Sequence, residues 1–147
     1  VPYRMGNGHA NLAPYQAFET SDGALIIAVG NDGQFARLCD VLGLDLADDE
    51  RFATNPARVS NRGELIPPIG AAVARWTKAD LASALEAKGI PSGPINNVAE
   101  VFADPQVIAR GMQIAPNGLP GVASPITIDG TRMVADTSSP PRPANDA

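Results

Sequence analysis

The sequence predicts an α+β fold in which a small antiparallel sheet packs with several short helices. Composition supports a globular chain, because 44% of its residues are hydrophobic, 18% are charged, and 147 residues can bury one core. Turn content then limits the helices. With 14 glycines and 14 prolines, turns are frequent and long helices are few, which argues against a helix bundle.

The first predicted elements are a hairpin and an amphipathic helix. β-prone runs at 16–20 and 24–29 flank Ser21-Asp22-Gly23, and Asp-Gly between such runs is a strong hairpin signal. Asn31 can then cap a helix that Gly43 ends. Four apolar residues recur with helical spacing between them: Phe35, Leu38, Cys39 and Leu42.

The middle of the chain predicts an interrupted helix. We expect one helical turn around Asp49–Ala53 and then a loop through Asn55-Pro56. Apolar residues keep helical spacing as far as Trp76, which we assign to the core. Because Pro67-Pro68 removes two backbone donors inside this run, we expect the helix only from about Pro68.

The remaining predicted elements are short. Thr77 with Asp80 three residues later resembles a capping box and predicts a helix that Gly89 ends. The prolines of residues 90–96 predict an extended backbone for that segment. The other expected elements are brief helices at 98–102 and 105–109, the second capped by Asp104, and β-prone stretches at 112–115, 125–128 and 132–135, the last two joined by Asp129-Gly130. We expect residues 1–136 to form the domain and 137–147 a flexible Pro-rich tail.

Charge and composition exclude several partners. The chain has 11 basic and 16 acidic residues, a net charge of −5, and no basic stripe to neutralise phosphates, so we expect no nucleic acid partner. No apolar run approaches the roughly 18 residues that cross a bilayer, so we expect no membrane partner. Cys39 is the single cysteine and can form no intrachain disulfide, which fits the cytoplasm.

No residue pattern indicates a nucleophile or a metal site. Cys39 lies on an apolar helix face, where packing is the better explanation, and no Gly-x-Ser-x-Gly elbow accompanies the single histidine, His9. One His and one Cys cannot fill a zinc site. Asp48-Asp49-Glu50 lacks the spacing of a calcium loop and is interpreted as a solvated helix start. We therefore expect no catalytic residue and no metal ligand.

Three arginines leave two interpretations open. Arg51, Arg58 and Arg62 could clamp a phosphate or carboxylate with their planar guanidinium groups. They could also pair with nearby acids at the surface, which is the more common use of such residues. We expect surface pairing.

The opening loop, residues 5–14, is the one candidate site. Its centre is Gly6-Asn7-Gly8-His9-Ala10-Asn11, where glycine lets the backbone approach a ligand and asparagine offers both donors and acceptors. Such a loop can also be a plain structural turn. Residue chemistry alone thus gives a soluble α+β domain and no reaction.

Several short segments occur in an order that is specific although each is weak alone. They are Gly6-Asn7-Gly8-His9, Pro14-Tyr15-Gln16, Asp22-Gly23, Ile27–Phe35, Arg51-Phe52, Thr54-Asn55, Arg58-Val59 with Asn61-Arg62, Gly89–Asn96, Asp104-Pro105-Gln106 and Arg110-Gly111-Met112. Together they resemble the family III CoA-transferases, the CaiB/BaiF family, which includes formyl-CoA transferases, carnitine CoA-transferases and α-methylacyl-CoA racemases. The likeness covers about residues 1–141.

The resemblance implies a small α+β domain, a partial family chain, that closes the active site of a larger protein. The family's catalytic aspartate belongs to a large α/β domain, and no segment here matches its surroundings, so we expect this chain alone to be inactive. In the family the matching loop lies beside the reacting carboxylate of the large domain, and in some transferases it is a glycine-rich flap that shields acyl intermediates from water. The residues that this implies for substrate binding are Gly6, Asn7, Gly8, His9, Asn11, Tyr15 and Gln16.

The resemblance also implies partners. They are a large CoA-transferase domain or a second copy in a homodimer, with a CoA ester as substrate and no cofactor. Two alternatives remain open: a stand-alone module that binds CoA esters or another protein without catalysis, and an inert scaffold fragment. The acyl donor, the acceptor and the choice between transfer and racemisation are left open as well.

Overall fold

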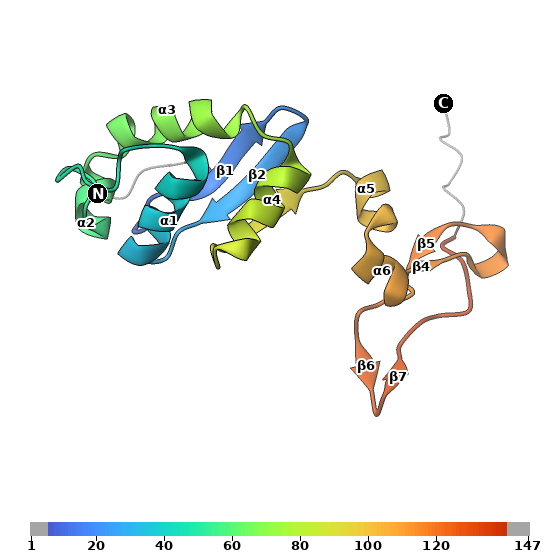
Figure 1. Ribbon diagram of the computed structural model, residues 1–147. Coiled ribbons are helices and arrows are strands. Elements are labelled where there is room, and N and C mark those ends of the chain that lie inside the picture. The colour runs from blue at the N-terminus through green and yellow to red at the C-terminus, as the bar shows by residue number, and fades with distance from the viewer. Residues whose placement is uncertain (1–5, 141–147) are drawn as a thin grey trace, which may run out of the picture. The chain divides into compact units, whose positions relative to one another are not determined.

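The computed structural model describes residues 6–140 and divides the chain into two compact units, Val1–Ile95 and Asn96–Ala147 (Figure 1). The predicted α+β class is confirmed, because small antiparallel sheets alternate with helices. The predicted domain boundary at residue 136 stays a prediction. The first unit contains β1 (Tyr15–Thr20), β2 (Gly23–Ala28), α1 (Asp32–Leu42), α2 (Asn55–Ser60), α3 (Arg62–Val73), α4 (Lys78–Ala87) and β3 (Ser92–Ile95).

The sheet of the first unit has one covered face and one open face. Its strands run antiparallel in the order β1-β2-β3. Phe18 lies opposite Leu25 on the covered face, where both are buried. Because side chains alternate along a strand, Tyr15 and Ile26 lie on the other face, where they are 36% and 40% exposed. Helices therefore cover only one side of this sheet.

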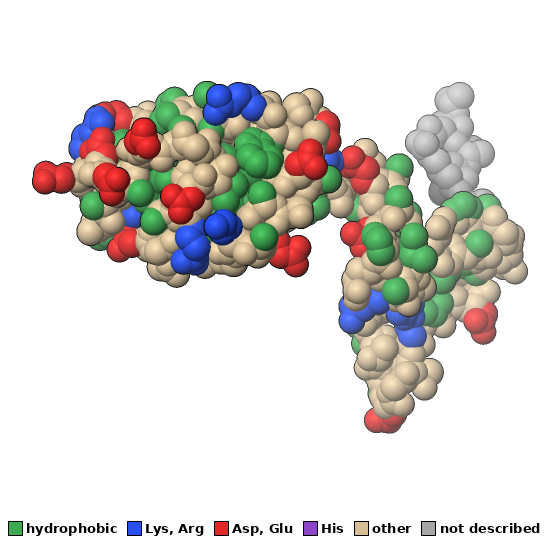
Figure 2. Space-filling view, in the orientation of Figure 1, with side chains coloured by type: hydrophobic (Ala, Val, Ile, Leu, Met, Phe, Trp, Pro, Cys, Tyr) green, Lys and Arg blue, Asp and Glu red, His purple; other side chains and the backbone are tan. Residues whose placement is uncertain are grey.

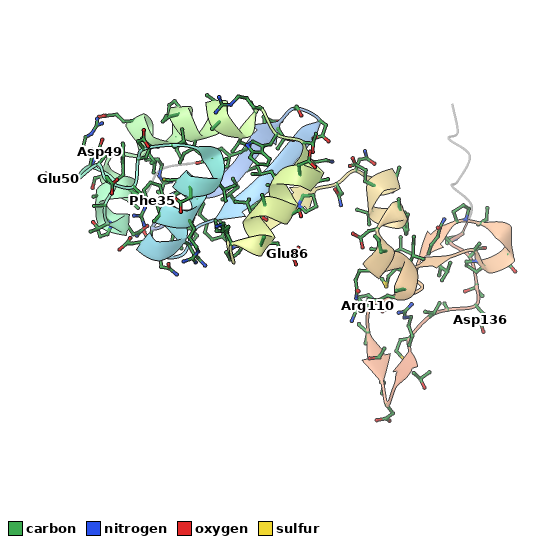
Figure 3. All side chains as sticks on the ribbon, in the orientation of Figure 1. Phe35, Asp49, Glu50, Glu86, Arg110 and Asp136 are labelled. Atoms are coloured by element: carbon green, nitrogen blue, oxygen red, sulfur yellow. The ribbon has the colours of Figure 1, made fainter. Side chains whose placement is uncertain are left out.

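The hydrophobic core lies between the covered face and the helices. Phe35 is 2% exposed and lies inside the first unit (Figure 3). Cys39 is buried in the same cluster, as predicted, and Trp76 packs against it while partly buried. The buried residues of the helices are mainly Leu38, Leu42, Leu65, Ile69, Val73, Leu81 and Leu85. Each fully buried side chain of this size stabilises the fold by about 1.5–3 kcal/mol.

Local signals predicted several elements correctly. The hairpin turns between Thr20 and Gly23, and Asn31 caps α1 by accepting a hydrogen bond from the Gln34 backbone N–H at 2.9 Å. Gly43 ends α1 in the left-handed conformation. Thr77 Oγ1 accepts from the Asp80 N–H at 3.1 Å and begins α4.

The prediction that the next helix starts near Pro68 is wrong. Helix α3 begins at Arg62 and holds Pro67 and Pro68 in its interior. The missing N–H groups would have bonded to the carbonyls of Gly63 and Glu64, which are exposed residues whose carbonyls water can solvate. Burial of Leu65, Ile69, Ala72 and Val73 on the other side of the helix offsets the cost of the prolines.

The predicted structure before α3 is also wrong. The segment expected as a loop forms α2, because Thr54 Oγ1 accepts from the Ala57 N–H at 3.4 Å and Pro56 occupies the first turn. The helical turn expected around Asp49–Ala53 is a single hydrogen-bonded turn, with the Phe52 N–H donating to the Asp49 carbonyl at 2.8 Å. Asp48-Asp49-Glu50 therefore starts no helix.

The second unit is built from short elements. Asp104 caps α6 as predicted, accepting from the Gln106 N–H at 2.8 Å. The strands β4 and β5 pair with each other, and β5 was not predicted. The elements are α5 (Val98–Ala103), α6 (Pro105–Ala109), β4 (Gln113–Ile114), the 3-10 turn η1 (Pro116–Gly118), β5 (Gly121–Val122), β6 (Thr127–Ile128) and β7 (Thr131–Arg132).

Large hydrophobic side chains of the second unit are exposed. Val98, Val122 and Ile108 are 73%, 65% and 63% exposed, and Figure 2 shows hydrophobic side chains over the visible face of this unit. Of the expected tail, residues 137–140 form no helix or strand, and 141–147 lie outside the described residues. Across the described part of the chain, no helix is both long and apolar enough to cross a membrane.

Candidate functional site

The opening loop runs along the outer edge of β1. The His9 N–H donates to the Tyr15 carbonyl at 2.9 Å, and the Asn7 Oδ1 accepts from the Ala17 N–H at 3.1 Å. These two bonds occupy backbone groups that an edge strand would otherwise leave unpaired. The loop therefore starts from a fixed position on the sheet.

Two side chains from α2 and α3 hold the backbone of the loop. The Arg62 Nη2 donates to the carbonyls of His9 at 2.7 Å and of Leu12 at 3.1 Å, with the Ala10 carbonyl at 3.5 Å. Asn55 donates from Nδ2 to the Asn11 carbonyl at 2.8 Å and accepts from the Ala13 N–H at 3.2 Å. The loop is thus hydrogen-bonded to β1 on one side and to side chains of α2 and α3 on the other.

Arg58 fixes the end of the loop from inside the core. Its side chain is fully buried and donates to the Ala13 carbonyl at 2.8 Å and the Phe52 carbonyl at 2.9 Å. A third bond, of 2.7 Å, reaches Asp32 at the start of α1. The guanidinium also lies over the Phe35 ring, 4.5 Å from its centroid. A planar group with five donors can meet partners in three directions at once.

The expectation of surface pairing is right for one of the three arginines. Arg51 forms ion pairs with Asp49, at 2.6 Å, and with Glu64. Hydrogen bonds from Arg51 lower the pKa of the Asp49 carboxyl. Figure 3 shows Asp49 at the periphery of the first unit, where the pair is solvated. For Arg62 the expectation is wrong, because its acceptors are backbone carbonyls. Arg58 does pair with an acid, Asp32, but from a fully buried position and not at the surface.

The spacing of these residues is a signal that the sequence carried. In the sequence, Asn55, Arg58 and Arg62 are three and then four residues apart, a spacing typical of one helix face, although the structure ends α2 at Ser60 and places Arg62 at the start of α3. Their acceptors are backbone carbonyls more than 40 positions earlier, apart from Phe52 and Asp32. Such acceptors leave no side-chain pattern, so the spacing indicated a shared role but not the groups that these side chains bind.

The predicted site residues separate into two groups. His9 stacks on Tyr15, with ring centroids 5.0 Å apart and planes at 16°, on the side of the open sheet face. Gln16 follows on the opposite face, where it lines a cleft of about 720 Å³ with Ser60, Arg62 and other residues. The remaining lining residues are Ala10, Val59, Gly63, Ile66 and Pro67.

The glycine and asparagine residues of the loop also differ in use. Gly6 has φ of +62°, and a Cβ at this position would meet nothing within 4 Å. Glycine is therefore favoured here for the left-handed backbone conformation and not for lack of space. The Asn11 backbone N–H donates to the His9 Nδ1 at 3.1 Å. Asn7 and Asn11 are exposed and Gly8 is half-buried. The loop side chains that remain available to a ligand are therefore mainly those of His9 and the two asparagines.

The side chains offer little intrinsic reactivity. Burial, together with the charge of nearby Asp40, raises the pKa of the Cys39 thiol to about 11, so the thiolate is scarce at neutral pH. Within residues 6–140, no group of three or more His, Cys, Asp or Glu side chains is placed to hold a metal ion. Acidic and basic side chains are interspersed on the visible face of the first unit in Figure 2. What the arrangement provides is a fixed loop that presents hydrogen-bonding groups.

Comparison with known proteins identifies the family. The sequence profile of CoA-transferase family III matches residues 1–146. The chain belongs to this family. A crystal structure of a CaiB/BaiF family protein from Brucella suis matches with a TM-score of 0.87 and 52% identity, over 95% of this chain and 37% of that one. The fold inferred from the resemblance is thereby confirmed.

Curated relatives within family III are much longer. The succinate–glutarate CoA-transferase of Agrobacterium fabrum is 48% identical over 145 residues, which are 95% of this chain and 36% of the relative. The human succinyl-CoA:glutarate CoA-transferase is 41% identical over 110 residues, which are 74% of this chain and 25% of the relative. The chain thus spans about a third or less of the length of these family members.

Proposed function

We propose that this chain is the small domain of a CoA-transferase that moves CoA between dicarboxylic acids. In this role it covers an active site whose catalytic carboxylate lies in a larger partner domain. The observation that carries the proposal is the 48% identity to a succinate–glutarate CoA-transferase, confined to 36% of that enzyme. An acetyl-CoA:oxalate CoA-transferase from Acetobacter aceti, 36% identical over 131 residues, supports dicarboxylic acids as the substrate class.

The opening loop suits the task of shielding an acyl intermediate. A CoA-transferase must keep its activated acyl group from water. A loop with a fixed backbone excludes water without having to become ordered again at each turnover. Hydrogen bonds from Arg62 and Asn55 to the loop carbonyls fix the backbone of the opening loop in this way. His9 and the two asparagines then offer hydrogen bonds to the thioester or carboxylate oxygens of a bound CoA ester.

Two apolar surfaces support a requirement for a partner. Tyr15, Ile26 and Ile95 are 36%, 40% and 46% exposed on the open sheet face. Apolar side chains of the second unit are exposed to a greater extent, among them Val98 at 73% and Val122 at 65%. Such surfaces are covered in stable proteins, and the large domain of the family is the expected cover, in the same chain or in a second copy.

The test begins with the isolated chain. Purified chain mixed with succinyl-CoA and glutarate should form no glutaryl-CoA above the uncatalysed rate, measured by mass spectrometry. Sustained formation would contradict the assignment of the catalytic carboxylate to another domain. Binding of free CoA to the isolated chain at micromolar concentration, measured by calorimetry, would favour the stand-alone binding module instead.

The second test supplies the large domain of a relative. The matching segment of the Agrobacterium fabrum enzyme is replaced by this chain, and the chimera is assayed for succinyl-CoA:glutarate exchange. At 48% identity over 95% of the chain, we expect a folded and active chimera. A chimera that folds and forms its normal oligomer but makes no glutaryl-CoA would overturn the proposed function.

A further inference from the structure

One guanidinium nitrogen of Arg62 donates hydrogen bonds to several backbone carbonyls of the opening loop near His9. The Arg62 Nη2 lies 2.7 Å from the His9 carbonyl and 3.1 Å from the Leu12 carbonyl. These acceptors lie on the two sides of Asn11, the residue whose backbone N–H bonds to the histidine ring. The position of Arg62 therefore sets the geometry of the short segment that carries the ring.

The same segment fixes which nitrogen of His9 carries the proton. The Asn11 N–H donates to Nδ1 at 3.1 Å, and a nitrogen that accepts this bond cannot itself be protonated. The neutral ring therefore holds its proton on Nε2. Stacking on Tyr15, at 5.0 Å and 16°, limits rotation of the ring. His9 is thereby set to act as a hydrogen-bond donor through Nε2.

We propose that Arg62 is a positioning residue for the acyl-transfer step: it holds the loop backbone so that His9 presents the Nε2–H group to an oxygen of the reacting acyl substrate. The oxygen is a thioester carbonyl or a carboxylate, the groups that a CoA-transferase must handle. The identity of the substrate rests on the proposed function, whereas the control of the His9 ring by Arg62 does not.

Geometry distinguishes this role from general stabilisation. The core contacts of the first unit are made by other residues, and the buried arginine is Arg58. Arg62 is half-buried, and the three described acceptors of its Nη2 are loop carbonyls. Arg51 is a matched control, because it is an arginine of the same region whose side chain pairs with Asp49 and Glu64 and, among the described residues, donates no hydrogen bond to the loop.

The first experiment reads the histidine tautomer directly in this chain. Because His9 is the single histidine, one imidazole gives all the ring signals in a long-range ¹H–¹⁵N correlation spectrum of the labelled protein. At about pH 8.5 we expect the Nε2–H pattern. Arg62→Ala should give averaged signals of both tautomers, and Arg51→Ala should keep the original pattern.

The backbone amide spectrum shows whether each variant folds. If Arg62→Ala does not fold, Arg62→Lys is the second variant, and we expect a partial shift toward the averaged pattern because lysine lacks the planar guanidinium. An Nδ1–H pattern in the unchanged chain, or an unchanged Nε2–H pattern in a folded Arg62 variant, would overturn the proposal.

The second experiment measures exchange in the chimera with the Agrobacterium fabrum enzyme. Arg62→Ala should lower kcat by about a hundredfold, the effect of a displacement near 1 Å, while KM changes much less. His9→Ala should cause a similar loss, and His9→Gln should recover part of it, since its amide N–H reaches close to the Nε2 position. Arg51→Ala should match the unchanged chimera.

The outcomes separate the two proposals. An inactive unchanged chimera contradicts the proposed function but leaves the tautomer result standing. An active chimera in which Arg62→Ala retains the kcat of Arg51→Ala contradicts the positioning role and leaves the proposed function intact.

Discussion

The buried guanidinium of Arg58 donates a 2.7 Å hydrogen bond to Asp32, whose side chain is 55% exposed at the first turn of α1. One end of this ion pair is thus inside the core and the other is in water. This hydrogen bond joins α2 to α1. The other two Arg58 nitrogens donate to the carbonyl of Ala13, at the end of the opening loop, and to the carbonyl of Phe52, in the segment before α2. The pair therefore connects the opening loop to the helical layer.

Asp32→Asn should lower the free energy of unfolding by about 1–2 kcal/mol. The change keeps an acceptor of the same shape but removes the charge that compensates Arg58, and partial exposure makes the loss smaller than for a wholly buried pair. Loss of an acid from the first helical turn adds to the effect. Urea denaturation measures it. Asp40→Asn, near the other end of α1, is the control and should change stability by less than about 0.5 kcal/mol.

Arg58→Lys should destabilise the chain although it keeps the charge. An ammonium cannot reach Ala13, Phe52 and Asp32 together, so at least one buried carbonyl loses its partner, at a cost of about 2–4 kcal/mol. The same substitution at Arg51 should change stability by less than about 0.5 kcal/mol. Equal urea midpoints for the two variants would contradict the argument.

Local chemistry allowed much of the fold to be predicted from sequence. The hairpin at Asp22-Gly23, the Asn31 and Thr77 caps and the Asp104 cap each act within a few residues, so a short window contains the whole cause. The start of α3 could not be predicted in this way. Its prolines are unfavourable locally, and the burial that outweighs them depends on contacts with distant residues.

The candidate site shows the same division. The unusual composition of Gly6–Asn11 marked the loop, but the residues that hold it come from α2 and α3 and bond to backbone carbonyls. The separation of Tyr15 from Gln16 follows from strand alternation once β1 is known to begin at Tyr15. Neither the hydrogen bonds from Arg62 to the loop carbonyls nor the tautomer of His9 could be inferred before the loop was placed against these helices.

Pro67→Ala should raise the free energy of unfolding by about 1–2 kcal/mol. Alanine restores an N–H donor for the Gly63 carbonyl, and part of the gain is lost because the unfolded chain becomes more flexible. Pro56→Ala provides a control of opposite sign. Pro56 lies in the first turn of α2, where no donor is needed, so its replacement should lower stability by about 0.4–1 kcal/mol. Thermal unfolding compares the two.

Asn55→Ala should loosen the opening loop without unfolding the core. The variant loses the bonds to the Asn11 carbonyl and the Ala13 N–H, so we expect hydrogen exchange in this segment to accelerate about tenfold. Mass spectrometry of the peptide that covers residues 8–14 measures the rate. Asn97→Ala, which removes the cap of α5 in the second unit, should leave exchange in this peptide unchanged.

Alkaline pH should destabilise the chain through Cys39. Burial raises the pKa of this thiol from 9.0 to about 11, so the folded state keeps the proton that the unfolded state releases. The resulting stability is fully present below pH 9 and declines as the pH rises from 9 toward 11. Cys39→Ala should be less stable at neutral pH because of the cavity, yet should lose less stability over this interval. Tyrosine and lysine titration is common to both proteins, so parallel pH profiles in urea denaturation would contradict the assignment of the decline to the thiol.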